Sequence, residues 1–143
     1  MPMNLTTIKN TGQETIIHFE CPAEIANATI TISGLAASTQ ARNSDTPRVN
    51  IVRFLSTGED GAVLEVARGI KTIIACAPEN APFLDLPSMG ITEAQQNDQD
   101  IVIRNVAAKR VSGYITLRKV AGWSGKVETA EFGSYDNPSV VGS

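Results

Sequence analysis

The sequence predicts an all-β protein built as a single β-sandwich. Seven or eight short runs rich in β-branched and aromatic residues recur about every ten residues. Turn signals containing Gly, Pro, Asn or Asp separate these runs, and no stretch has a convincing helical period. Two packed sheets with a jelly-roll or an immunoglobulin-like topology suit such strands. The pattern of runs leaves both topologies open.

The first third of the chain is expected to hold an arm, two strands and a long loop. Residues 1–13 are polar and predict an N-terminal arm that ends at a turn signal. Residues 14–19 alternate weakly and predict the first strand. Residues 28–33 alternate cleanly, which places the isoleucines inward and the threonines outward. Residues 34–48 have no period and predict a long loop.

The middle of the chain predicts a hairpin, a buried strand and a short edge strand. Residues 49–56 and 62–67 flank a glycine-containing turn, which is typical of a β-hairpin. A second turn follows at Gly69. The nearly continuous apolar run 71–77 favours a strand that is buried on both faces. Prolines surround residues 83–86, so at most a short edge strand is expected there.

The stretch 100–123 predicts the final hairpin, because two β-rich runs flank a short polar connection. If Ile103 lies opposite Ile115, the isoleucines and Leu117 share a core face. The other face is mixed and places Arg104 beside Tyr114 in a cation–π contact. A shift of one residue in register would invert both faces.

This hairpin also carries most of the charge asymmetry of the chain. Residues 100–126 hold six basic residues and one acidic residue, a net charge of +5, whereas the remainder holds six basic and fourteen acidic residues, a net charge of −8. Such polarity favours association with an acidic partner, although charges also keep a solvated hairpin from pairing edge to edge. The candidate basic contacts are Arg104, Lys109, Arg110, Arg118 and Lys119.

Composition limits the classes of function. A chain of 143 residues with 42% apolar content can bury the core of one domain, expected over residues 14–123. A net charge of −3 and a pI near 5.1 argue against direct binding to nucleic acid. No apolar run is long enough to span a membrane, and no signal-peptide pattern is present. Cys21 and Cys76 are expected to be reduced, with a disulfide left open.

Motifs for catalysis are missing from the sequence. The only histidine, His18, lies in a predicted strand with no nearby nucleophile, which favours a structural role. Metal-binding and phosphate-loop motifs are absent, and Glu59 and Asp60 are typical of an ordinary hairpin turn more than of a calcium loop. We therefore expect a binding protein that is not an enzyme and that needs no cofactor and no metal.

The C-terminal end is expected to be a second arm. Residues 124–143 contain few large apolar side chains and no core-facing period. Such a segment would become ordered only against a neighbouring molecule. Trp123, Phe132 and Tyr135 are therefore candidate contacts with a partner, together with the basic residues named above.

Several short pieces between residues 30 and 123 resemble small structural proteins of tailed bacteriophages. In those proteins an Arg-Gly turn joins two central strands, and the last strand ends in a Lys-x-x-Gly-aromatic pattern. The matching pieces are Ser33-Gly34-Leu35, Val49-Asn50-Ile51, Val66-Ala67-Arg68-Gly69, Phe83-Leu84-Asp85-Leu86, Asp100-Ile101-Val102-Ile103 and residues 113–123.

The resemblance implies a virion component, above all a head decoration (cement) protein that binds the major capsid protein or another virion protein and stabilises the shell. Such a protein would be made in the host cytoplasm, form oligomers, with trimers favoured, and lie on the capsid surface. Two alternatives stay open: a neck, connector or tail component of the same virion, and a small carbohydrate-binding β-sandwich. A sugar platform would use exposed aromatic residues, here Tyr114, Trp123 and Tyr135.

Overall fold

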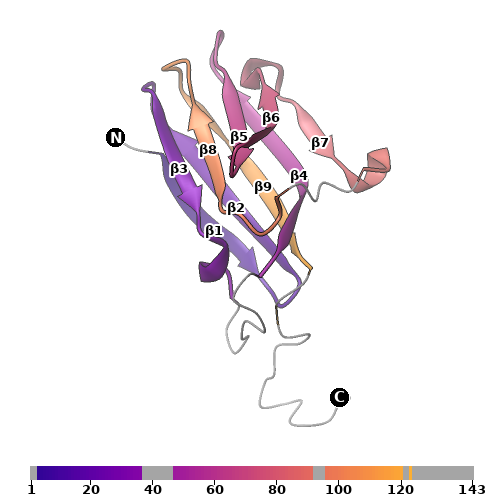
Figure 1. Ribbon diagram of the computed structural model, residues 1–143. Helices are drawn as coiled ribbons and strands as arrows, with labels where there is room; N and C mark the ends of the chain where they lie inside the picture. Colours follow the sequence, from indigo (N-terminus) through magenta and orange to yellow (C-terminus); the bar gives the residue numbers. More distant parts are fainter. Residues whose placement is uncertain (1–2, 37–46, 92–95, 121–122, 124–143) are drawn as a thin grey trace, which may run out of the picture.

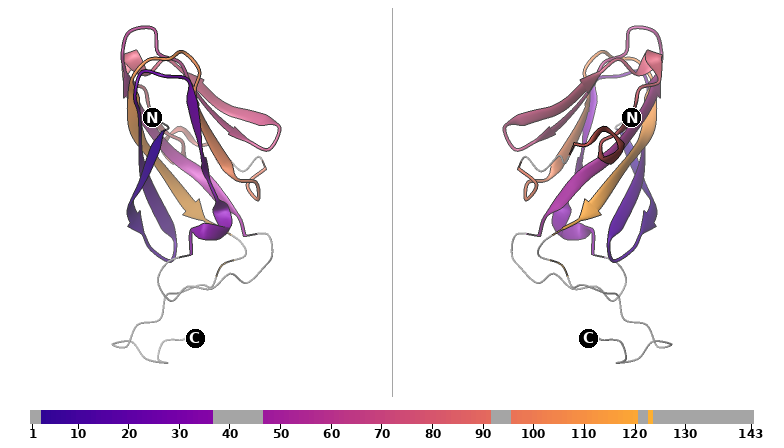
Figure 2. Two further views of the ribbon diagram at one scale, coloured as in Figure 1. Left: turned by 90° about the vertical axis from the view of Figure 1, so that its left-hand side faces the viewer. Right: turned by 90° about the vertical axis from the view of Figure 1, so that its right-hand side faces the viewer.

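The fold is a sandwich of two antiparallel β-sheets (Figure 1), and the two side views of Figure 2 show its two layers. The computed structural model describes residues 3–36, 47–91, 96–120 and 123. The strands in this part of the chain are β1 (Asn4–Asn10), β2 (Glu14–Cys21), β3 (Ala26–Ile30), β4 (Val49–Gly58), β5 (Leu64–Arg68), β6 (Lys71–Cys76), β7 (Phe83–Asp85), β8 (Ile101–Asn105) and β9 (Val111–Lys119), with short 3-10 helices η1 (Ile32–Gly34), η2 (Pro78–Asn80) and η3 (Pro87–Met89).

The strand order identifies the sandwich as a jelly roll. One sheet has the order β1-β2-β9-β4-β7, and the other has the order β3-β8-β5-β6. The chain crosses between the sheets after β2, β3, β4, β6, β7 and β8, and the last two strands insert between earlier ones, which winds two Greek keys together. β1 adds one more strand beside β2. The predicted all-β sandwich is confirmed, and its topology is the jelly-roll one.

The core between the sheets consists of aliphatic side chains and stacked phenylalanines. Every second residue of a strand points into the space between the sheets. The rings of Phe19 and Phe54 stack with their centroids 5.6 Å apart. Gly113 lies opposite Phe19, where a Cβ atom would come within 2.8 Å of that ring and collide with the carbonyl oxygen of Leu55. Only glycine lets β9 pass between β2 and β4 at this point.

The predicted hairpin over residues 100–123 is wrong, because β8 and β9 lie in different sheets. Ile103 and Ile115 are fully buried, as expected, but they reach the core from opposite sides. Arg104 and Tyr114 therefore point outward on opposite faces of the sandwich, and no cation–π contact joins them. Alternation determines which side chains of a strand face inward, but it does not determine which strand pairs with it in the sheet.

The hairpin predicted for residues 49–56 and 62–67 is wrong for the same reason, since β4 and β5 also lie in different sheets. Residues 71–77 are not buried on both faces either. They contain β6, the edge strand of the four-stranded sheet, in which Lys71 and Ala75 are exposed. Only the inner face of this sheet meets the core, so one side of β6 stays in solvent.

Several local predictions are confirmed. The first predicted strand lies within β2, and β7 is a three-residue edge strand. β5 and β6 are joined by a tight turn in which Gly69 has a φ of +57°. Ile30 and Ile32 point inward, with exposed fractions of 3% and 2%. The strand predicted over residues 28–33 nevertheless ends at Ile30, and η1 follows it.

The predicted N-terminal arm is largely a strand. Residues 4–10 form β1, which pairs antiparallel with β2 and has a bulge between Thr7 and Lys9. The segment alternates poorly because an edge strand covers only the margin of the core, and its backbone hydrogen bonds to β2 hold it in place. The predicted C-terminal arm and residues 37–46 of the long loop lie outside the described residues.

None of the helices in the described ranges is long and apolar enough to cross a membrane.

Candidate interaction surfaces

The structure separates the basic residues that the sequence groups together. Arg104 lies on the outer face of the four-stranded sheet and pairs with Glu65 at 3.4 Å. Arg118 lies on the outer face of the five-stranded sheet, and Lys109 and Arg110 lie in the β8–β9 loop. The expected single basic face is not formed, because β8 and β9 belong to different sheets.

Lys119 and Trp123 are both only 7% exposed and close the lower end of the sandwich. The Nζ atom of Lys119 donates to Oδ1 of Asn10 and to the carbonyl oxygen of Thr11, both at 2.9 Å, and lies 4.9 Å from the centroid of the Trp123 ring. The indole nitrogen of Trp123 donates to the carbonyl oxygen of Arg48 at 3.0 Å. Burial lowers the pKa of Lys119 to about 8. The bonds of Lys119 and Trp123 named here are to atoms of the same chain. The other predicted contacts, Phe132 and Tyr135, lie outside the described residues.

The opposite, upper end of the sandwich is a set of loops that hydrogen bonds tie together. The buried Asn105 donates from Nδ2 to the carbonyl oxygens of Glu24 at 3.0 Å and Lys109 at 2.7 Å. Glu59 accepts a bond from the backbone nitrogen of Arg110 at 2.8 Å and donates its own backbone N–H to the Arg110 carbonyl at 3.0 Å. We call this surface the loop end; it comprises residues 22–25, 59–63 and 106–110.

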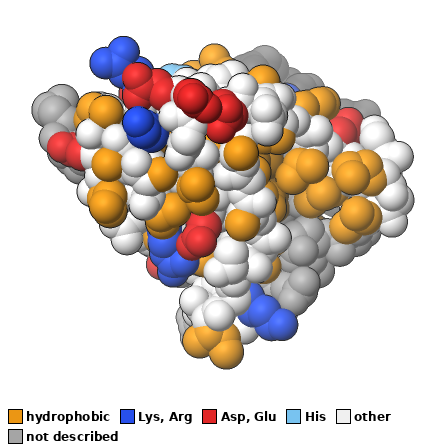
Figure 3. All heavy atoms as spheres, turned by 90° about the horizontal axis from the view of Figure 1, so that it is seen from above, with side chains coloured by type: hydrophobic (Ala, Val, Ile, Leu, Met, Phe, Trp, Pro, Cys, Tyr) orange, Lys and Arg blue, Asp and Glu red, His pale blue; other side chains and the backbone are white. Residues whose placement is uncertain are grey.

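The loop end exposes apolar side chains. Ile25 is 72% exposed, Val63 is 38% exposed and Val106 is 40% exposed. The backbone nitrogen of Val106 donates to the carbonyl oxygen of Val63 at 3.2 Å, so these two valines are held close together. Seen from above, hydrophobic side chains lie among charged ones on this end (Figure 3). Lys109 and Arg110 are exposed in the same loops.

Two hollows flank the start of β9 at the loop end. One has a volume of about 380 Å³ and the other about 290 Å³, and residues Arg110, Val111 and Ser112 line both. Their other walls come from the ends of β1 and β2 with Pro22 on one side, and from the end of β4 with Glu59 on the other. The surface is therefore ridged, which suits contact with a shaped partner.

A row of large side chains crosses the outer face of the five-stranded sheet. The strand register places His18 beside Tyr114, Tyr114 beside Leu55, and Leu55 beside Phe83. Tyr114 is 44% exposed and Phe83 is 57% exposed. The rings of His18 and Tyr114 have their centroids 4.8 Å apart at 51°. We call these four residues the aromatic row.

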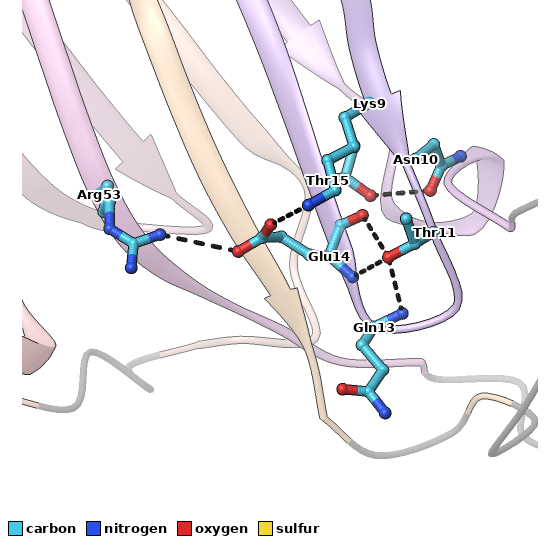
Figure 4. A network of polar contacts seen from close by, with 7 residues as sticks. All are labelled: Lys9, Asn10, Thr11, Gln13, Glu14, Thr15 and Arg53. Atoms are coloured by element: carbon cyan, nitrogen blue, oxygen red, sulfur yellow. Dashed lines mark hydrogen bonds and ion pairs between the residues drawn. The ribbon is translucent and has the colours of Figure 1, made fainter.

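A chain of ion pairs runs beside the aromatic row. Glu14 accepts a bond from Lys9 at 2.9 Å and lies 3.6 Å from Arg53 (Figure 4). Arg53 also lies 3.6 Å from Asp85. A hydrogen bond from the Ser88 hydroxyl, helped by the positive charge of Arg53, lowers the pKa of Asp85. We call Lys9, Glu14, Arg53 and Asp85 the charged row.

The β1–β2 turn holds Glu14 in position for this network. The Thr11 hydroxyl accepts a bond from the Glu14 backbone nitrogen at 3.1 Å, and the Thr15 hydroxyl donates to Oδ1 of Asn10 at 2.9 Å (Figure 4). These bonds close the turn and bring Lys9 and Glu14 together at the base of β1 and β2. The order of charges on this face is thus built into the sheet.

Both cysteines are free thiols. The Sγ atom of Cys76 lies 3.6 Å from the Ser56 hydroxyl, and burial raises the pKa of the Cys76 thiol. Cys21 is buried against Asn105. A thiol with a raised pKa stays protonated near neutral pH and is a poor nucleophile. Within the described ranges, no three His, Cys, Asp or Glu residues lie close enough together to hold a metal ion.

Sequence reasoning missed the aromatic and charged rows. Their residues come from β1, β2, β4, β7 and β9, which become neighbours only through the sheet order. The one local signal was the outward position of Tyr114 in its strand, and it was assigned to a neighbour in the wrong sheet. A jelly roll pairs strands that are distant in sequence, so no short motif could reveal these rows.

The fold and these surfaces define a jelly-roll protein with two faces suited to contacts with other molecules. No family model and no curated protein matches the sequence. One similar solved structure is a cupin domain from Bordetella pertussis Tohama I, with a TM-score of 0.40 and 8% identity over 84% of this chain and 95% of that one. Another is Peruvianin-I, a cysteine peptidase from Thevetia peruviana latex, with a TM-score of 0.39 and 12% identity over 86% of this chain and 66% of that one. Neither similarity assigns a function.

Proposed function

We propose that the protein is a structural component of a tailed-phage virion, and in particular a decoration (cement) protein that binds the major capsid protein without catalysing a reaction. The sequence pieces that resemble such proteins support this proposal. The jelly-roll topology, which viral capsid domains also use, is compatible with it. The protein would be made in the host cytoplasm and carried on the capsid surface.

The loop end is the observation that carries the proposal. Loops on a rigid scaffold are where binding residues concentrate. Burial of Ile25, Val63 or Val106 against a partner would contribute at most about 1.5 kcal/mol for each side chain. Lys109 and Arg110 would attract an acidic surface and speed association with it. Hydrogen bonds already order these loops, so little conformational entropy is lost on binding.

The first test is the copy number of the chain in purified particles from its source, measured by quantitative mass spectrometry against the major shell protein. A count equal to that of the shell protein, or a simple fraction of it, supports the decoration role. A count of about six to a few dozen would assign the chain to the neck or tail instead. Absence from the particles would overturn the proposal.

A matched pair of variants tests the loop end itself. Ile25 and Ile70 are both exposed, at 72% and 95%, but Ile70 lies in the β5–β6 turn at the far end of β5. Ile25→Asp should weaken binding to undecorated shells by about tenfold or more, because it puts a charge into an apolar contact. Ile70→Asp should leave binding unchanged. Equal effects of the two substitutions would contradict a role for the loop end.

A carbohydrate-binding module is the second candidate, and the exposed Tyr114 beside His18 is the observation that favours it. Sugar rings pack on exposed aromatic faces of this kind. Trp123, the other described candidate for a platform, is buried. Glycan binding that Tyr114→Ser abolishes, in a protein absent from particles, would establish this function in place of the first.

A further inference from the structure

We infer that the outer face of the five-stranded sheet packs against the same face of a second copy, around a two-fold axis that runs along β9. The aromatic and charged rows carry this inference, and the loop end has no part in it. It is therefore independent of the proposed function, because it concerns a contact between copies and not attachment to a shell.

The arrangement of charges about β9 is the first argument. β9 is the central strand, with β2 and β1 on one side and β4 and β7 on the other. From β1 to β7 the charged row has the order Lys9, Glu14, Arg53 and Asp85, which is positive and negative on one side of β9, then positive and negative on the other. A rotation that exchanges the two sides therefore exchanges the signs.

This order makes the face complementary to itself. In an isologous contact, a residue on one side of the axis meets the residue at the same distance on the other side. An axis along β9 brings Lys9 level with Asp85 of the second copy, because both residues align with Thr116 of β9. Glu14 aligns with Arg118, two residues further along β9, so it lies diagonally across from Arg53 of the second copy. An axis across the strands would instead oppose Lys9 to Lys9. Charge order thus selects both the partner and the direction of the axis.

The aromatic row is the second argument, because it lies on the same face and crosses the same axis. Tyr114 belongs to β9 and would meet Tyr114 of the second copy, while His18 would meet Leu55. The contact would cover Tyr114 and Phe83, which are 44% and 57% exposed in a single chain. Aromatic side chains are enriched at the centres of protein interfaces.

The area and the shape of the face are sufficient for a contact between two copies. Five strands about 4.8 Å apart and about eight residues long cover about 650 Å² per copy, close to the roughly 800 Å² of a standard interface. Sheets pack face to face with their strands nearly aligned, as this axis requires. A groove of about 290 Å³ beside β4 lies where the axis would carry the β1–β2 turn of the second copy.

Arg118 is the one like-charged contact near the axis. It lies on β9, is exposed and would face Arg118 of the second copy. The two-fold arrangement therefore predicts that Arg118→Ser tightens the dimer several-fold. If Arg118→Ser weakened the dimer instead, the position of the axis would be wrong.

Sedimentation equilibrium and light scattering on the full chain are the tests. The wild-type protein should form a dimer with twice the chain mass of 15.2 kDa. Arg53→Glu should raise the dimer dissociation constant at least about tenfold, because it places a negative charge diagonally across from Glu14 of the second copy. Arg104→Glu is the matched control, since Arg104 has a similar ion pair on the other sheet, and it should change nothing.

A double swap separates the contact between copies from the ion pairs within one chain. In Glu14→Arg combined with Arg53→Glu, the opposed charges across the axis are again complementary, whereas Lys9 and Asp85 each face a like charge within the chain. Dimerisation should return to within about threefold of wild type, although the fold is less stable. A wild-type protein that stays monomeric at about 100 μM, or a double swap no better than Arg53→Glu, would overturn the inference.

Discussion

The outer faces of the two sheets differ in the size and the order of their side chains. On the five-stranded sheet, the aromatic row has residues on β2, β9, β4 and β7, and the charged row has residues on β1, β2, β4 and β7. On the four-stranded sheet, Arg104 and Glu65 form one ion pair, and the other outward positions include Asn27, Thr29 and Ala75. A face that stays in solvent needs only short or flexible side chains. Large, ordered side chains on the uncovered five-stranded sheet are the ones that the inferred contact between copies would bury.

The lower ends of the two sheets differ as well. Each end holds a buried cation, an arginine in one sheet and a lysine in the other. Arg68, at the end of β5, is fully buried and donates to the carbonyl oxygens of Val49 at 2.6 Å, Asn97 at 2.8 Å and Gln99 at 3.1 Å. Lys119 has the equivalent place at the end of β9. Arginine keeps its charge at any ordinary pH, whereas lysine can lose a proton. The anchor of the five-stranded sheet is therefore the pH-sensitive one.

The largest expected effect comes from Arg68→Met, which keeps the apolar stem and removes the guanidinium group. Three backbone carbonyls would lose their donor, at about 1 kcal/mol or more each, so the free energy of unfolding should fall by about 3 kcal/mol. Urea unfolding measures this change. Arg68→Lys keeps the charge but cannot reach all three carbonyls, so it should lower the free energy of unfolding by less than Arg68→Met does. An unchanged stability in Arg68→Met would show that the carbonyls find other partners.

The pH dependence of Lys119 gives a smaller effect. Burial lowers the pKa of Lys119 from 10.5 to about 8, so between these pH values the unfolded chain binds the proton and the folded chain does not. The free energy of unfolding should therefore rise between pH 8 and 10.5, with at most about 1.4 kcal/mol per pH unit from this group. Below pH 8 both states bind the proton, so the slope vanishes and the full cost of burying the charge is present.

Unfolding curves of Lys119→Met and wild type across this pH range isolate the contribution. The variant should lose this part of the slope, because it keeps the buried stem without a titrating group. Lys71→Met is the control, since Lys71 is exposed on β6. Identical slopes in Lys119→Met and wild type would contradict the lowered pKa.

The smallest effects concern the outer faces. Arg53 joins two carboxylates, Glu14 and Asp85, whereas Arg104 joins only Glu65. Exposed ion pairs contribute little singly and more in a network. Measured on the monomer at low protein concentration, Arg53→Ala should cost about 1 kcal/mol and Arg104→Ala about 0.5 kcal/mol or less. A larger loss for Arg104→Ala would reverse the contrast between the faces.

Local patterns predicted the inward and outward sides of most strands. Ile30, Ile32, Ile103 and Ile115 are all buried, as their alternation indicates. The position of Phe83 in an edge strand followed from the flanking prolines. These predictions succeeded because side-chain direction along a strand depends only on local backbone geometry.

The candidate surfaces could not be predicted in the same way. Arg104 and Arg118 are close in sequence but lie on opposite faces, whereas Glu14 and Arg53 are far apart in sequence and meet in space. Lys119 looked like an exposed basic residue, because its run gives no sign of the turn that covers it. Partners of this kind depend on strand order, which the chain reaches only when the sheets assemble.

By itself, the sequence determined the all-β class, the two-residue period of the strands and the residues that supply the core. The tertiary structure alone decided the jelly-roll topology, the separation of β8 from β9 and the ion pair between Glu14 of β2 and Arg53 of β4. The physical reason is that alternation is a property of one strand and survives any choice of neighbour. Neighbours are chosen by the joint packing of all the strands around one core.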